Sequence, residues 1–331
     1  MPKALARTVV RRLSAALMLV AVALFSPSTW SQEAWPARPV KLVVSFPAGG
    51  GVDVVVRDLA TRLSALWGQP VVIDNKPGGN GVIAADLTAK AAPDGYTLFA
   101  SYDGMIVLPF LQDKLPYDTL SDFRAVGMVT TLPMILVASP HLKVNTLAEL
   151  VAAAKAQPGA IEYASNGVGA TPHMGMEFLQ RAAGITLKHI PYRGSGPAMQ
   201  DILGGRVGLM WAAVSSALPH IKSRKLVPIA YGSRQRSPLL PQVPTVAESG
   251  YPGFEAVSWV GLIGPARMPN AVVQKINADL QKVAHDPAFV EQQVAKGSEV
   301  RSGSSEDLTR QIRTEFDRNK SLFASGAIAK E

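Results

Sequence analysis

The sequence predicts an α/β fold in which mostly parallel sheets, flanked by helices, are divided between two lobes. From Pro39 onward, short β-branched runs alternate with amphipathic helical patterns, which is typical of α/β proteins. The runs are almost continuously apolar, as expected of parallel strands that are buried on both faces. Nine such runs are more than one compact sheet usually carries, so we expect two lobes.

The strand candidates are rich in Val, Ile, Leu and aromatic residues. They are residues 40–46, 71–74, 97–101, 134–138, 162–165, 188–192, 208–212, 227–231 and 259–263.

Helical patterns separate these runs. Residues 52–66 carry Val and Leu at alternating spacings of four and three, and Gly68 supplies a C-terminal stop. Thr171 and Pro172 are expected to be the N-cap and first residue of a second helix, which ends before Gly184. Further helices are expected at 148–156, 197–203, 272–284 and 307–322.

Two proline-containing stretches, residues 129–133 and 237–254, are the candidate crossings between lobes. We expect the chain to leave lobe 1 near residue 132 and to return near residue 257. Lobe 1 would then comprise residues 32–132 and 257–331, and lobe 2 residues 133–256.

The N-terminus has the features of a secretory signal peptide. A basic segment ending at Arg12 precedes an apolar run, residues 13–25, that is broken only by Ser14. As a helix this run would reach about 20 Å, which is short of the ~30 Å hydrocarbon layer. We expect cleavage near Ser31 and export to the periplasm; an uncleaved anchor is the alternative.

Composition excludes several classes of protein. The chain has no Cys, so disulfide scaffolds, thiolate catalysis and cysteine metal sites are ruled out. Half of the net charge of +8 comes from four basic residues before Ser31. No cluster of Lys and Arg with interleaved aromatic residues remains, so we expect no nucleic-acid partner.

Two glycine-rich turns are the main functional candidates. Each lies between a strand and a helix, one expected in each lobe, where glycine lets the backbone approach a ligand and the helix dipole favours an anion. Ligands of α/β proteins lie beyond the carboxyl ends of strands, so both turns should face one cleft. The first turn comprises Pro47, Ala48, Gly49, Gly50, Gly51, Val52 and Asp53, and the second Ser165, Asn166, Gly167, Val168, Gly169, Ala170 and Thr171.

Neither turn contains Lys or Arg, so we predict that main-chain N–H groups hold a carboxylate. Ordinary tight turns that need a positive φ are the structural alternative. His173 is either a donor to the ligand or a half-exposed helix residue. Asp53 complements the dipole of its helix and is a candidate ligand contact, and Trp211 is the tryptophan best placed for the cleft.

The sequence lacks the motifs of nucleotide binding, of many hydrolases and of metal binding. The nucleotide motifs Gly-x-Gly-x-x-Gly and Gly-Lys-Ser/Thr are absent, and so is the Gly-x-Ser-x-Gly of many hydrolases. The five histidines form no i,i+4 pair, so we expect no metal site. A hydrolase would need Ser165 and His173 together with an acid that we cannot assign.

Ten segments of the mature chain, in order, resemble the Bug-type extracytoplasmic solute receptors of tripartite tricarboxylate transporters. Among them are Trp35-Pro36-x-x-Pro39-Val40, Phe46-Pro47-Ala48-Gly49-Gly50-x-x-Asp53, Pro93-Asp94-Gly95-Tyr96-Thr97-Leu98, Tyr163-x-Ser165-x-Gly167-x-Gly169 and His189-x-Pro191-Tyr192-Arg193-Gly194. The resemblance implies a two-lobe periplasmic binding protein of type II-like fold, with a ligand cleft between the lobes. It also implies that the two turns and His173 grip the carboxylates of the ligand.

Three positions depart from the pattern of that family. Val52 stands where Ser or Thr is common, and Gly208 where Asp is usual. Asp103, shortly after Ser101 at the end of a strand, is also unusual. An acid there would repel a second carboxylate, so we expect a ligand with a donor, a cation or an aromatic body near Ser101 and Asp103.

The sequence therefore predicts a monomeric, non-enzymatic receptor without a cofactor. Its partners would be a small organic carboxylate and the membrane subunits of a tripartite tricarboxylate transporter. An exported hydrolase of small esters or amides, and an orphan receptor that feeds a sensor kinase, are the alternatives.

Overall fold

The computed structural model describes residues 35–48, 51–192 and 194–326. The chain divides into a short unit that ends at Ala37 and a larger one, Arg38–Glu331, which contains both lobes. The expected signal peptide, residues 1–31, and its cleavage point near Ser31 lie outside the described residues. Within the described ranges, no helix is long and apolar enough to cross a membrane.

The described strands form one ten-stranded sheet in the order β2-β1-β3-β9-β4-β7-β5-β6, with β8 and β10 also paired to β4. Their bounds are β1 Val40–Val44, β2 Val71–Asn75, β3 Thr97–Tyr102, β4 Phe123–Ala138, β5 Glu162–Ser165, β6 Lys188–Pro191, β7 Leu209–Ala213, β8 Val227–Tyr231, β9 Val257–Pro265 and β10 Glu299–Val300.

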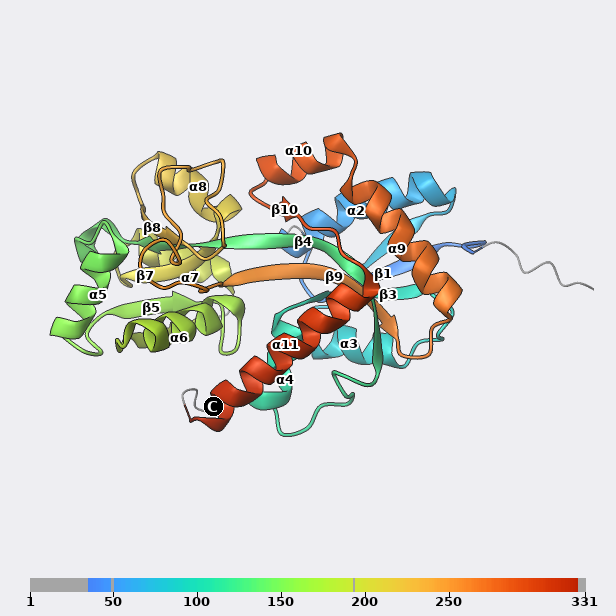
Figure 1. Ribbon diagram of the computed structural model, residues 1–331, viewed down its shortest axis with the longest axis horizontal. Coiled ribbons are helices and arrows are strands. Elements are labelled where there is room, and N and C mark those ends of the chain that lie inside the picture. Colours follow the sequence, from blue (N-terminus) through green and yellow to red (C-terminus); the bar gives the residue numbers. More distant parts are fainter. Residues whose placement is uncertain (1–34, 49–50, 193, 327–331) are drawn as a thin grey trace, which may run out of the picture. The chain divides into compact units, whose positions relative to one another are not determined.

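Parallel strands form the outer part of each lobe, as expected. β1 pairs in parallel with β2 and β3, and β5 with β6 and β7. The long strands β4 and β9 are antiparallel to each other and run side by side from one lobe to the other (Figure 1). The two-lobe α/β fold predicted from the sequence is confirmed, with antiparallel pairs added at its centre.

The first expected crossing, residues 129–133, is not a connecting stretch but part of β4. β4 pairs with β9 as far as Pro133, and with β7 from Met134 onward. Pro133 has no N–H to donate, and it stands where the strand changes partner. This change of partner supports the predicted lobe boundary near residues 132 and 257, which stays a prediction.

Six of the helices were predicted, with boundaries shifted by a few residues; α3, α4, α8, α10 and two short 3₁₀ turns were missed. The helices are α2 Gly51–Trp67, α3 Val82–Ala89, α4 Gly104–Leu111, α5 Leu147–Ala156, α6 Thr171–Ala183, α7 Ser195–Leu203, α8 Val214–Lys222, α9 Asn270–Ala284, α10 Pro287–Ala295 and α11 Ser305–Ala324, and the 3₁₀ turns are η1 Gly79–Gly81 and η2 Pro140–Leu142.

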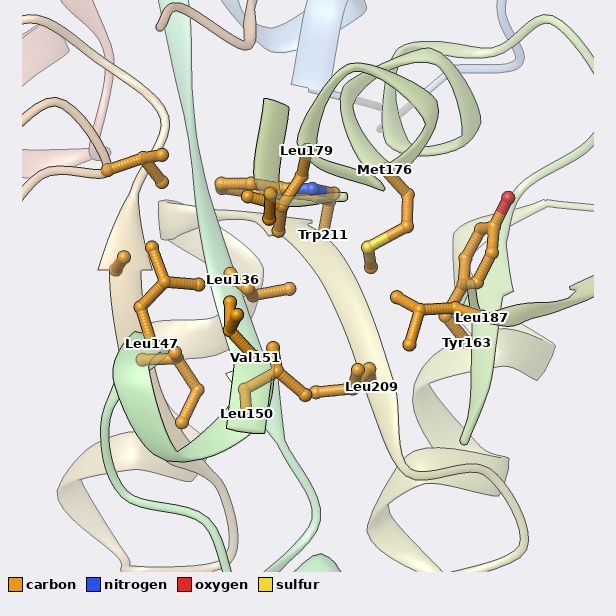
Figure 2. Close-up of a cluster of buried hydrophobic side chains, with 14 of the residues drawn as sticks. Leu136, Leu147, Leu150, Val151, Tyr163, Met176, Leu179, Leu187, Leu209 and Trp211 are labelled. Atoms are coloured by element: carbon orange, nitrogen blue, oxygen red, sulfur yellow. The ribbon is translucent and has the colours of Figure 1, made fainter. Parts of the chain in front are cut away.

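The sheet of lobe 2 is buried on both faces. Successive residues of β4 point to opposite sides, so Leu136 joins one hydrophobic cluster while Ile135 and Val137 join another. Figure 2 shows the first cluster, in which Leu136 lies among side chains from α5, α6 and β7. In β5, Tyr163 joins the first cluster and Ala164 the second, so two apolar layers also fix the strand from which the second glycine-rich turn departs.

Candidate functional site

The first glycine-rich turn joins β1 to α2, and its residues 49–50 lie outside the described part of the chain. Pro47 and Ala48 are exposed, and Gly51 opens α2. Val52 is buried, so its side chain belongs to the core and not to the surface of the turn.

Asp53 supports this turn from within the protein. Its carboxylate accepts hydrogen bonds from Arg57 Nε and Asn75 Nδ2, both at 2.8 Å. Asn75 Nδ2 also donates to the carbonyl oxygen of Phe46 at 2.9 Å. The Asp53 side chain is only 1% exposed, and these bonds tie the start of α2 to the ends of β1 and β2. Its observed role is therefore to hold the turn in place.

The second glycine-rich turn is fixed by hydrogen bonds of its own. Ser165 Oγ accepts from the N–H of Gly167 at 3.1 Å and lies 2.6 Å from Nε2 of His189. The N–H of Gly169 donates to Nδ1 of His173 at 2.9 Å. The φ angles of the two glycines are 135° and 74°, a region that other residues rarely adopt. Two N–H groups that we expected to meet a ligand are thus used inside the turn.

Other N–H groups of this turn have no partner in the described part of the protein. Those of Asn166, Val168, Thr171 and His173 donate to no described residue. The side-chain Oδ1 of Asn166 is buried and also lacks a partner there; rotation of the amide would place Nδ2 at the same point. Because α6 begins at Thr171, its dipole adds to the attraction of these donors for an anion.

His173 braces the turn instead of lying half-exposed. The N-cap of α6 is Ala170, and not Thr171 as we predicted. The helix therefore begins one residue earlier than expected, and His173 is its third residue. The His173 ring is buried and stacks on His189 with 4.2 Å between centroids. Burial lowers the pKa of His173 to about 3. The ring is therefore neutral, and since Nδ1 accepts from Gly169, its proton lies on Nε2, 3.8 Å from Glu177 Oε1.

Asp103 connects the two lobes. Its Oδ2 accepts a hydrogen bond from Thr171 Oγ1 at 2.6 Å, and its Oδ1 accepts one from Ser258 Oγ at 2.5 Å. Burial raises the pKa of Asp103, and the two hydroxyl groups oppose that rise. Both carboxylate oxygens are thus satisfied within the protein, whereas we expected this acid to face the ligand. Likewise the side chain of Thr171 is used for this bond and not as a helix cap.

Two further candidates lie away from the turns. Ser101 is buried, and its Oγ lies 3.4 Å from Sδ of Met105. Trp211 is fully buried in the core of lobe 2, where it stacks on Phe254 and lies beside Leu179 (Figure 2). Its side chain packs in the core and its indole Nε1 has no partner among the described residues, so a contact of Trp211 with the cleft stays a prediction.

Sequence reasoning missed several polar and aromatic groups near the first turn. Tyr102 donates from its hydroxyl to the carbonyl oxygen of Asn80 at 2.7 Å and packs edge-on against Phe46. Ser45 Oγ is buried without a partner among the described residues. Tyr102 stands between two residues that we predicted to be near the ligand, Ser101 and Asp103. That position could have identified it as a further candidate.

A cavity with an empty volume of about 380 Å³ lies between the lobes. Of the predicted site residues it includes Asp103 and Thr171, and side chains of α4, α6, β9 and α11 complete its walls. Of the described residues of the two glycine-rich turns, Thr171 alone lines it. In the described residues, no group of three or more His, Asp or Glu side chains is placed to hold a metal ion.

Comparison with known proteins gives consistent matches. The family model described as "Tripartite tricarboxylate transporter family receptor" matches residues 55–327. BugT of Bordetella pertussis is 40% identical over 270 residues, which covers 81% of this chain and 83% of BugT.

Two solved structures from Rhodopseudomonas palustris are similar over most of the chain. One, solved with adipate, is 32% identical, covers 88% of this chain and 98% of its own, and has a TM-score of 0.79. The other, MatC with bound malate, is 29% identical, covers 87% and 100%, and has a TM-score of 0.76.

Proposed function

Because this chain belongs to the family of tripartite tricarboxylate transporter receptors, we propose that it captures a small organic carboxylate in the periplasm. The ligand would lie in the cleft between the lobes, and the loaded receptor would present it to the membrane subunits of a transporter. The protein would act as a monomer, without a cofactor and without catalysis.

The observation that carries the proposal is the set of main-chain donors at the start of α6. Four N–H groups in residues 166–173 have no partner in the described part of the chain, and they adjoin the positive end of a 13-residue helix. An anion bound by such groups gains about 1.5–3 kcal/mol per charge-assisted hydrogen bond before costs. Micromolar binding needs about 8 kcal/mol net, so three or four such bonds need further donors from the first turn to reach it.

We assign the two turns distinct roles in this proposal. The second turn is rigid, because its own hydrogen bonds fix Ser165, Gly167 and Gly169. Its outward N–H groups and Asn166 would bind one carboxylate. The exposed Pro47 and Ala48 and the N-terminal end of α2 would bind the ligand from lobe 1, while Asp53 holds that turn in position.

Dicarboxylates are the first ligands to test, since adipate and malate are bound in the two R. palustris relatives. A thermal-shift screen should compare mono-, di- and tricarboxylates with amino acids and aromatic acids. At 100 times its dissociation constant, a true ligand adds about 2.7 kcal/mol of stability. Dimethyl adipate, which lacks the charges of adipate, is the matched control. Stabilisation by neutral or cationic compounds alone would contradict the proposal.

One contact favours a hydrolase as a second candidate, namely the 2.6 Å separation of Ser165 Oγ and His189 Nε2. However, burial lowers the pKa of His189 to about 4, which makes it a weak general base, and Ser165 is fully buried. An assay with p-nitrophenyl acetate and a Ser165→Ala control separates the two functions. We expect no turnover above that of the variant.

A further inference from the structure

A second pocket lies within lobe 1, away from the described residues of both glycine-rich turns. It is lined by residues of β3, β4, β9, α4, α11 and the segment that precedes β4, and it is partly open to solvent. Most of its wall is apolar and comes from Met105, Ile106, Phe123, Ala125, Ile263 and Ile312.

One polar group in the wall has no partner. Thr119 is 7% exposed, and its hydroxyl forms no hydrogen bond with any described residue. A buried hydroxyl without a partner destabilises the protein, so a ligand that supplies an acceptor would remove this cost. The hydroxyl of Ser101, also in the wall, has only the weak acceptor Sδ of Met105.

Among the lining residues, Arg313 of α11 is the charged one. It is exposed and forms no ion pair or hydrogen bond with the described residues. Two acids lie on the neighbouring segment, but their carboxylates are used locally. Asp118 accepts from the N–H groups of Leu120 and Ser121, and Asp122 accepts from the N–H of Asp118.

We propose that this cavity binds a short-chain aliphatic monocarboxylate. The chain lies against the isoleucine and methionine side chains, and the carboxylate lies at Arg313 and the Thr119 hydroxyl. Apolar walls with a few placed polar groups are the usual form of such sites. The site is separate from the proposed cleft, because none of the described residues of either glycine-rich turn lines it.

Methyl NMR with hexanoate as the probe tests this inference directly. The δ1 methyl groups of Ile106, Ile263 and Ile312 report on the cavity, and those of Ile185 and Ile229, buried in lobe 2, are internal controls. We expect saturable shifts of the first three and none of the last two. 1-Hexanol, which has the same chain without the charge, should bind at least tenfold more weakly.

Three variants complete the test. Arg313→Gln should weaken hexanoate binding at least tenfold, whereas Arg310→Gln, which alters the Asp307 ion pair on the same helix, should leave it unchanged. Ala125→Leu fills the cavity and should abolish the shifts, with an unchanged lobe 2 spectrum as the check of folding.

Three outcomes would overturn the inference. They are equal affinity of Arg313→Gln and the parent protein for hexanoate, binding of 1-hexanol as tight as that of hexanoate, and the absence of shifts at the δ1 methyl groups of Ile106, Ile263 and Ile312. None of these outcomes bears on the proposed function of the glycine-rich turns.

Discussion

Glu315 of α11 is a buried acid that holds Trp259. The indole Nε1 of Trp259 donates to both carboxylate oxygens at 3.1 and 3.0 Å, and Gln311 Nε2 donates at 2.6 Å. Burial, reinforced by the nearby charge of Asp103, raises the pKa of Glu315 to about 7. In the unfolded chain the group would ionise near pH 4.5, so the folded protein retains this proton over a wider range of pH.

The pH dependence of stability follows from that difference. Between about pH 4.5 and 7 the folded state binds more protons at Glu315, so the free energy of unfolding falls as the pH rises. Glu315→Gln removes this dependence while keeping an acceptor for Trp259. We expect the difference in free energy of unfolding, variant minus parent, to become more positive by about 2–3 kcal/mol as the pH rises from 4.5 to 8. Urea unfolding at several pH values measures this difference, and the exposed Glu306→Gln is the control. The same pH dependence of the free energy of unfolding in Glu315→Gln and the parent would contradict the prediction.

Gly169 is where the second turn touches lobe 1. A Cβ at this position would lie 2.1 Å from Leu111 Cδ1 of α4, and φ is 74°. Gly184 has a similar φ of 62° but open space around it. Gly169→Ala should therefore reduce the free energy of unfolding by about 1–3 kcal/mol more than Gly184→Ala does, since it adds overpacking to the same backbone strain. Denaturant titrations measure both, and the difference should shrink in a Leu111→Ala background.

The limits of sequence reasoning are clearest at such residues. The glycine-rich turns were identified from their composition and their place between strand and helix. That Thr171 would bond to Asp103 was not predictable, because the two are 68 positions apart and meet only after both lobes fold. The packing of Trp211 in the core was not predictable either, because its place near the end of a strand does not reveal which face of the sheet its side chain points to.

The helix α11 depends on its N-terminal cap. Ser304 Oγ accepts from the N–H of Asp307 at 3.1 Å, and Asp307 Oδ2 accepts from the N–H of Ser304 at 2.9 Å. Ser304→Ala should lower the free energy of unfolding by about 1 kcal/mol. The exposed Ser302→Ala, just outside the cap, should have little effect. Equal losses in the two variants, measured by thermal unfolding, would show that the cap does not stabilise the helix.

Among the elements, periodic and strongly apolar segments were predicted well. The strands β5 and β8 have the bounds expected from the sequence. The first half of β4 was missed, because Gly127 and Pro133 interrupt its pattern and its strand character comes from pairing with β9. α4 was missed for a related reason, since Pro109 lies inside it.

At the scale of the whole molecule, we propose that main-chain N–H groups of the two turns, one in each lobe, bind a carboxylate without a basic side chain. Arg193, which follows β6, lies outside the described residues, and it is the basic residue closest in sequence to the end of that strand. It is therefore the side chain whose removal tests the claim.

Amide NMR with adipate and malate as probes tests this claim most directly. We expect saturable downfield shifts of the amide protons of Asn166, Val168 and Thr171 and of the first residues of α2. Arg193→Gln should weaken binding by less than about tenfold. Shifts that are confined to one lobe, or a loss of more than about a hundredfold in Arg193→Gln, would contradict main-chain binding by the two turns.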